Sequence, residues 1–127
     1  MNRVADLQLT AGVRRDLRRA AEAAYPLEAC GALLGAGARV TDIRPLPNRS
    51  SEADRSYEIS PSDLEPLLRD DVSGGPSVIG FYHSHPDADT QPSSRDQELA
   101  WPDYWYLIVG VDDGVATSHS SWRLPHA

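Results

Sequence analysis

Two histidines and an aspartate form the densest group of possible metal ligands in the sequence. His83 and His85 are followed after seven residues by Ser93, and Asp96 stands three positions beyond that serine. Side chains two positions apart in a strand point to the same face, so the two imidazoles project together. Zinc favours imidazole nitrogens and carboxylate oxygens, and a set of three protein ligands leaves a position for water, as in catalytic sites. We therefore expect one zinc ion (Zn2+) per chain, held by His83, His85 and Asp96.

The pattern H-x-H-x7-S-x2-D is specific. In a shuffled chain of the same composition it would arise roughly one time in a thousand, and the proline that follows His85 lowers the chance further. The alternative is a pair of structural histidines at a solvated strand end, which leaves the spaced Asp96 without an explanation. Other divalent ions also bind imidazole-rich sites, and zinc is the simplest assignment.

Glu28 is the candidate general base. It lies in the segment PLEACG, where it follows the end of a predicted helix and precedes an apolar strand. A carboxylate close to a metal but not bound to it can accept a proton from the attacking water. The alternative for Glu28 is an exposed charge at the entrance of a strand.

A buried strand and a helix must bring these residues together. The run SVIGFYH, which ends at His83, is apolar almost throughout and is typical of a central strand buried on both faces. Pro86 should end the strand, and the following loop is long enough to fold the next helix, with Asp96 in its first turn, over the imidazoles. Helices are predicted at about 11–24, 62–71 and 94–100, and strands at about 7–10, 30–35, 40–46, 77–83, 104–111 and 115–124.

Local signals support the predicted elements. Thr10 can cap the first helix, and the proline after Tyr25 ends it. Ser62 and Glu65 have the spacing of a capping box at the start of the second helix. Helices and strands alternate along the chain, which favours an α/β fold with a mixed β-sheet flanked by helices.

Composition limits the functions that are open to this chain. Its 127 residues suit a single domain, residues 1–127. The formal net charge is −7 and the twelve basic residues, all arginine, are scattered, which disfavours nucleic acid as a ligand. One cysteine allows no internal disulfide, and no apolar run reaches the roughly 18–20 residues of a membrane span. We expect a cytoplasmic protein with no membrane partner.

The sequence resembles the JAMM (MPN-plus) metalloprotease family, in which an E-x-C-G-like strand start precedes H-S-H-P and then S-x-x-D. Here these motifs are Glu28 with its neighbours, residues 83–86, and Ser93 with Asp96, and the resemblance runs from about Leu7 to about Trp122. It implies a fold like that of cytidine deaminase and a zinc ion. It also implies hydrolysis of peptide or isopeptide bonds at the C-terminal tail of ubiquitin-like proteins.

The resemblance implies catalytic roles as well. Glu28 would take a proton from the attacking water and return it to the leaving amine, and Ser93 would donate a hydrogen bond to the oxyanion. Ser93 or Ser94 can instead be a helix N-cap, and the two roles can coexist. Asp87 and Asp89 are interpreted as solvated turn residues, with steering of a cationic leaving group as the alternative.

The chain is close to a bare catalytic core, because the segments 48–59 and 101–103 are too short for ubiquitin-gripping insertions. It is therefore similar to the stand-alone prokaryotic members, which remove small adducts from sulfur-carrier proteins, and its expected partner is a ubiquitin-like or sulfur-carrier protein with a Gly-Gly tail. A non-catalytic MPN-type interaction scaffold is the alternative, although such proteins usually lack part of the ligand set. A zinc deaminase would need a P-C-x-x-C pair, which a single cysteine cannot supply.

Overall fold

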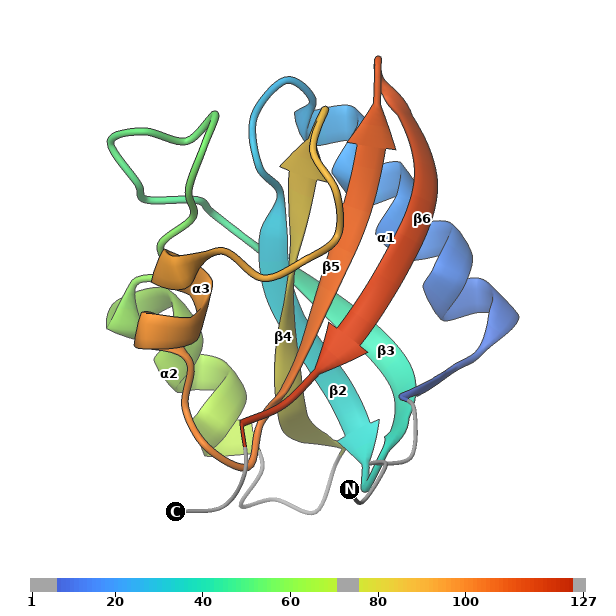
Figure 1. The fold of residues 1–127 in the computed structure, drawn as a ribbon. Coiled ribbons are helices and arrows are strands. Elements are labelled where there is room, and N and C mark those ends of the chain that lie inside the picture. Colours follow the sequence, from blue (N-terminus) through green and yellow to red (C-terminus); the bar gives the residue numbers. More distant parts are fainter. Residues whose placement is uncertain (1–6, 71–75, 125–127) are drawn as a thin grey trace.

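A six-stranded mixed sheet forms the centre of the fold (Figure 1), which a computed structural model describes for residues 7–70 and 76–124. The strand order is β1-β3-β2-β4-β5-β6. The pairs β1–β3 and β4–β5 are parallel, and the other neighbours are antiparallel. The strands are β1 (Gln8–Leu9), β2 (Cys30–Ala36), β3 (Arg39–Leu46), β4 (Ser77–Pro86), β5 (Trp105–Asp112) and β6 (Val115–Trp122).

Burial separates the central strands from the outer ones. β2, β4 and β5 are buried at nearly every position, which agrees with their almost continuous apolar sequences. β3 and β6 lie further out: β3 exposes most of its residues, and β6 has no buried residue. The mixed α/β sheet predicted from the sequence is confirmed.

Helices cover both faces of the sheet (Figure 1). α1 (Ala11–Ala24) lies on one face, and α2 (Pro61–Asp70) and α3 (Ser94–Leu99) lie on the other. Leu17 of α1 packs in one core cluster with Leu33 and Tyr82, whereas Leu64 of α2 packs in a second cluster with Phe81. Because side chains alternate along β4, His83 and His85 lie on the same face as Phe81, under α2 and α3.

Two helix starts were predicted, with different outcomes. The Thr10 side chain accepts a hydrogen bond from the N–H of Val13 at 3.1 Å, so the predicted cap of α1 is confirmed. The capping box at Ser62 is wrong, since α2 already begins at Pro61 and the Ser60 carbonyl accepts its first backbone hydrogen bonds. Proline suits the first helical position, where no intrahelical N–H bond is lost. Residues 71–75, which include the predicted end of this helix and most of the following turn, lie outside the described residues.

β4 extends beyond the apolar run that ends at His83 and ends at Pro86, as the sequence predicts. Pairing with β5 carries the strand past His83, because His85 faces Gly110 and Pro86 faces Val111, whereas the register with β2 ends at His83. Both histidines are therefore held within the sheet. In residues 7–70 and 76–124, no helix has the length and apolar character needed to cross a membrane.

Candidate metal centre and catalytic groups

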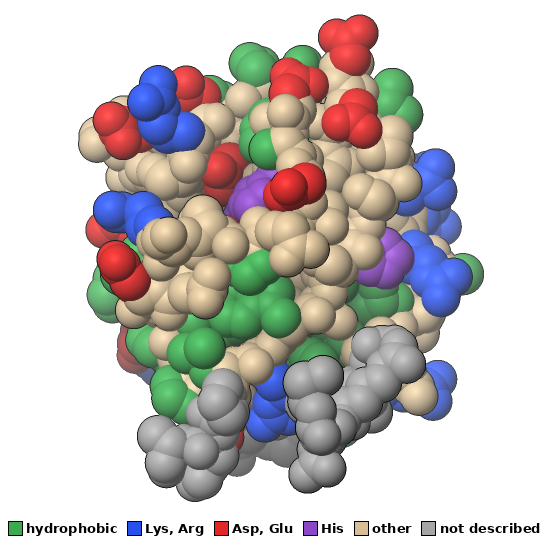
Figure 2. All heavy atoms as spheres, viewed as in Figure 1, with side chains coloured by type: hydrophobic (Ala, Val, Ile, Leu, Met, Phe, Trp, Pro, Cys, Tyr) green, Lys and Arg blue, Asp and Glu red, His purple; other side chains and the backbone are tan. Residues whose placement is uncertain are grey.

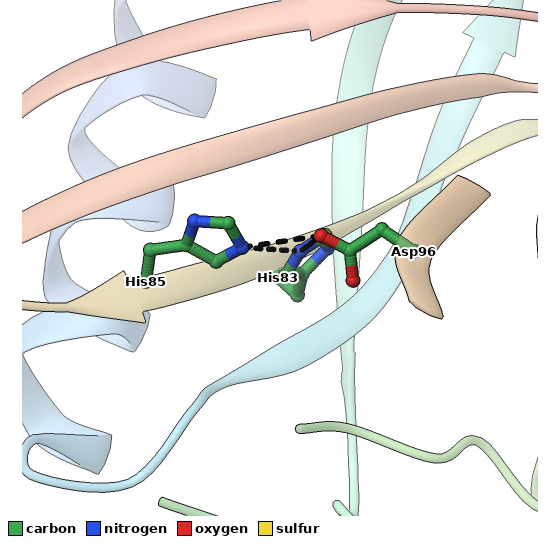
Figure 3. Close-up of side chains that lie close together, drawn as sticks. All are labelled: His83, His85 and Asp96. Atoms are coloured by element: carbon green, nitrogen blue, oxygen red, sulfur yellow. Dashed lines mark hydrogen bonds and ion pairs between the residues drawn. The ribbon is translucent and has the colours of Figure 1, made fainter. Parts of the chain in front are cut away.

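His83, His85 and Asp96 point toward one another between β4 and α3 (Figure 3). The Nε2 atoms of the two histidines lie 3.1 Å apart, and each lies 3.3 Å from Oδ2 of Asp96. Among the described residues these three form a group whose ligand atoms all lie within 4.8 Å of one another. The structure thus brings together the three residues that the sequence predicts as metal ligands.

The spacing and chemistry of these atoms fit zinc. In a tetrahedral site with bonds of about 2.0–2.1 Å, neighbouring ligand atoms lie about 3.3 Å apart. Two imidazole lone pairs and a carboxylate oxygen at this range repel one another unless a proton or a cation lies among them. The His83 and Asp96 side chains are only 1% and 10% exposed, so water does little to relieve that repulsion.

Neighbouring groups orient the three side chains. Nδ1 of His85 lies 2.7 Å from the carbonyl oxygen of Asp89, and a hydrogen bond donated there leaves Nε2 free to bind a metal. The N–H of Ser93 donates to Oδ2 of Asp96 at 2.8 Å. The Tyr57 ring stacks on His83 with centroids 4.3 Å apart and an angle of 20° between the planes.

The charges of the three groups favour a cation between them. Burial lowers the pKa of His83, against the raising effect of Asp96. Burial also opposes the charged form of His85, but hydrogen bonds to Asp96 and to the Asp89 carbonyl outweigh it and raise the pKa of His85. Burial alone would raise the pKa of Asp96, yet the hydrogen bonds from both histidines hold it far below its usual value. Asp96 is therefore ionised, as a metal ligand must be.

Glu28 faces the same groove as His85 and Asp96. Its side chain is 6% exposed, and Oε1 has no hydrogen-bond partner among the described residues. Burial raises the pKa of Glu28 to about 7, while His85 lowers it and Asp96 raises it. A buried carboxylate with a free lone pair and a pKa near neutrality has the properties of a general base. The alternative interpretation of Glu28 as an exposed charge is wrong.

Ser93 is the N-cap of α3. Its hydroxyl oxygen accepts from the N–H of Asp96 at 3.0 Å, and the Asp96 carboxylate accepts from the N–H of Ser93 in return. This reciprocal capping box confirms the capping interpretation. The hydroxyl retains its own proton for donation, so the role of Ser93 toward an oxyanion stays a prediction.

Asp87 and Asp89 are exposed turn residues, as predicted, but both also have structural partners. The Asp87 carboxylate accepts from the hydroxyl of Tyr25 at 2.6 Å and from the N–H of Asp113 at 2.8 Å. These bonds tie the loop after His85 to the end of α1 and to the β5–β6 turn. Asp89 contributes its carbonyl to His85, an interaction that residue spacing does not reveal.

A groove of about 850 Å3 opens beside His85 and Asp96. Figure 2 shows a recessed histidine side chain among acidic groups, with a hydrophobic patch next to it. Tyr57, which the sequence analysis did not single out, lines this groove, because the loop that carries it folds across β4. The sequence gives little indication of this position, since a single aromatic residue in a polar loop can pack in many different places. The apolar part of the lining is formed by Ile59, Leu64, Leu68, Phe81, Leu99 and Trp101.

Comparisons with known proteins agree with this geometry. The family of prokaryotic homologues of the JAB domain matches residues 10–125. A desampylase from Haloferax volcanii is 43% identical over 97 residues, which are 74% of this chain and 69% of that protein. A probable TtuB-protein conjugate cleaving protease from Thermus thermophilus is 37% identical over 89 residues, which are 68% of this chain and 58% of that protein.

A solved structure supports the fold. The crystal structure of a JAB1/MPN domain protein from Archaeoglobus fulgidus matches with a TM-score of 0.64 at 21% identity. The match covers 94% of this chain and 90% of that protein. The predicted JAMM/MPN fold is therefore confirmed.

Proposed function

Because this chain belongs to the family of prokaryotic homologues of the JAB domain and is a JAMM-type isopeptidase, we propose that it uses zinc to hydrolyse the bond after the C-terminal Gly-Gly of a ubiquitin-like or sulfur-carrier protein. The observation that carries this proposal is the convergence of His83, His85 and Asp96 on the groove that the buried Glu28 also lines, where Oε1 of Glu28 has no hydrogen-bond partner among the described residues. The names of the two relatives, a desampylase and a protease that cleaves TtuB–protein conjugates, support a protein conjugate as the substrate.

In this proposal one zinc ion per chain would be held by His83, His85 and Asp96. Zinc in such a site acts as a Lewis acid and makes water a stronger nucleophile at neutral pH. The protein supplies the orientation of the ligands. The Asp89 carbonyl selects the His85 tautomer, and the backbone of Ser93 fixes the Asp96 carboxylate.

Glu28 moves the proton in the proposed reaction. Its free carboxylate oxygen accepts a proton from the water that attacks the scissile carbonyl. As the carbon–nitrogen bond breaks, Glu28 returns that proton to the leaving amine, and the carrier protein is left with a free carboxylate. A pKa of about 7, raised by burial, suits a group that first accepts and then donates a proton near neutral pH.

Ser93 stabilises the charge that develops on the carbonyl oxygen. Its hydroxyl oxygen already accepts from the N–H of Asp96, so its hydroxyl proton is available to the substrate. One such donor contributes about 3 kcal/mol to transition-state stabilisation in related chemistry.

The groove supports an extended tail as the substrate segment. Its lining runs from Glu28 and Asp96 to apolar residues of α2 and to Leu99 and Trp101. Glycines next to the scissile bond suit such a site, because a chain without Cβ atoms can approach the ligand residues closely. The short 48–59 segment supports a preference for small carriers over polyubiquitin. A single domain over residues 1–127 and a cytoplasmic location are part of the proposal.

A non-catalytic scaffold is the alternative function. The complete ligand set and the unpartnered Glu28 carboxylate weigh against it, because a scaffold has no use for a buried acid that costs stability. Bound zinc and turnover in the purified protein distinguish the two functions.

The substrate is tested with a matched pair of β-grasp carrier proteins, one ending in Gly-Gly-X and the other in Ala-Ala-X. Intact-mass analysis should show loss of X from the first carrier at least ten times faster than from the second, with slower cleavage of linked diubiquitin. Equal cleavage of both carriers would indicate a broader peptidase, and faster cleavage of diubiquitin would indicate a true deubiquitinase.

A further inference from the structure

The Glu28 carboxylate has no side-chain anchor. Oε1 is buried without a partner, and no described residue donates a hydrogen bond to the carboxylate. A catalytic group must nevertheless be held close to its productive position, because a displacement of about 1 Å can cost on the order of a hundredfold in rate. The orientation of Glu28 must therefore come from its backbone and from packing.

The backbone of Glu28 is held on both sides by the loop 48–58. The N–H of Glu28 donates to the carbonyl of Ala53 at 2.7 Å, and the carbonyl of Glu28 accepts from Nδ2 of Asn48 at 3.1 Å. The next residue, Ala29, is tied to Ser84 of β4 by two hydrogen bonds, Ala29 N–H to the Ser84 hydroxyl at 2.8 Å and Ser84 N–H to the Ala29 carbonyl at 3.0 Å. Of these anchors, Asn48 is the only side chain among the described residues that forms a hydrogen bond with the backbone of Glu28 itself.

Every hydrogen-bonding position of the Asn48 amide is used. Nδ2 also donates to the carbonyl of Ser56 at 3.0 Å, while Oδ1 accepts from the N–H groups of Ser50 at 3.0 Å and Glu58 at 3.1 Å. Two carbonyl partners on one side and two N–H partners on the other fix which atom is nitrogen. Ser56 and Glu58 flank Tyr57, whose ring stacks on His83. One amide thus joins Glu28 to the segment that packs on a metal ligand.

We propose that Asn48 is a positioning residue for the reaction, which acts through Glu28 and sets the carboxylate against the metal ligands. The inference rests on the proposed role of Glu28 as general base. The donor half of the amide, Nδ2, holds the backbone of Glu28, whereas the acceptor half, Oδ1, holds only the turn of the loop. The two halves can be separated by substitution.

The variant Asn48→Asp keeps an oxygen for the N–H groups of Ser50 and Glu58 but cannot donate to Glu28 or Ser56. We expect kcat on the Gly-Gly carrier to fall about 10- to 100-fold, with KM changed less than about threefold and zinc content unchanged. Asn48→Ala adds no charge and should likewise lower kcat with little change in KM. If the Asn48→Asp protein does not fold, Asn48→Ala serves as the test variant in its place. The matched control is Ser50→Ala, which removes loop hydrogen bonds to Ser56 and Glu52 without touching Glu28 and should leave kcat near that of the unmodified protein.

A double-mutant cycle with Glu28→Gln distinguishes positioning of Glu28 from a general structural role. If Asn48 acts through Glu28, adding Asn48→Asp to Glu28→Gln lowers the residual rate by less than about twofold. A loss in the double variant equal to the product of the two single losses would overturn the inference, as would normal kcat in Asn48→Asp. If Glu28→Gln alone loses most of its activity, the assignment of Glu28 as the base stands even when the positioning role of Asn48 is overturned. Normal turnover of Glu28→Gln would overturn both the base assignment and the positioning role.

Discussion

His83, His85 and Asp96 place three electron-rich atoms 3.1–3.3 Å apart in a largely buried setting. The three atoms repel one another electrostatically when no cation lies among them. Each of the three side chains also has a neighbouring group that holds it in place. The Asp89 carbonyl holds His85, the Ser93 backbone holds Asp96, and the Tyr57 ring covers His83. Single residues at this site therefore divide into ligands and the groups that orient them.

Loss of any one ligand should remove the metal. We expect about one zinc per chain in the unmodified protein and near zero in His83→Ala, His85→Ala and Asp96→Ala, because two remaining ligands bind zinc weakly. Metal analysis of the purified proteins measures this. Asp89→Ala is the control, since within the described residues its side chain is hydrogen-bonded only to the N–H of Gln91, and the variant keeps the carbonyl that holds His85. Undiminished zinc in all three ligand variants would refute the assignment.

At the scale of elements, the site depends on β4 and α3, which differ in how firmly the fold holds them. β4 is paired on both sides and buried, whereas α3 has six residues, none of them buried. The capping box between Ser93 and Asp96 is therefore important for α3. It provides hydrogen-bond partners for backbone N–H groups at the start of the helix, and it also orients the Asp96 carboxylate, the proposed metal ligand.

Substitutions of Ser93 separate its capping role from a role in catalysis. Ser93→Ala removes the cap and should cost about 0.5–2 kcal/mol of stability, together with a fall in kcat of about a hundredfold or more. Ser93→Asp can still cap the helix but has no proton to donate, so its stability should be close to that of the unmodified protein while its kcat stays low. Ser93→Thr should retain both properties. Denaturant unfolding and carrier cleavage measure the two effects, and full activity in Ser93→Asp would show that Ser93 only caps the helix.

Local signals predicted the elements better than their ends. α1 runs from Ala11 to Ala24 as predicted, since its start and stop depend on Thr10 and on the proline after Tyr25. The end of β4 at Pro86 was also predicted, because proline is a local signal, whereas the start of α2 was not, since this helix begins at Pro61 and not at the predicted capping box. The ligands were predictable because strand periodicity places His83 and His85 on one face. The contacts of Asp87 with Tyr25, and of Asn48 with Glu28, join segments far apart in sequence and could not be predicted from spacing.

At the scale of the whole molecule, the proposed metal would link the central sheet to the outer layer of helices. Two of the proposed ligands belong to β4 and the third to α3, which has no buried residue. α1 covers the opposite face of the sheet (Figure 1) and supports β4 from behind, through the cluster that contains Leu17 and Tyr82. Metal binding and folding should therefore be coupled in this chain.

Removal and return of zinc should change thermal stability. A ligand that binds only the folded state at a hundred times its Kd stabilises that state by about 2.7 kcal/mol, which for a chain of this size raises Tm by about 10 °C. We expect this rise when zinc is added to the chelator-treated protein, and no rise for Asp96→Ala, as differential scanning calorimetry would show. An equal rise in both proteins would mean that zinc binds elsewhere.

In the proposed mechanism this chain is a zinc-dependent isopeptidase in which Glu28 moves the proton. The most direct test measures zinc content and single-turnover cleavage of the Gly-Gly carrier for the unmodified protein and for Glu28→Gln. Glutamine keeps the size and polarity of the side chain but cannot accept the proton of the attacking water. The predicted result is an unchanged zinc content of about one per chain with a cleavage rate at least a hundredfold lower. A Glu28→Gln protein that cleaves at the normal rate, or that loses its zinc, would contradict the claim.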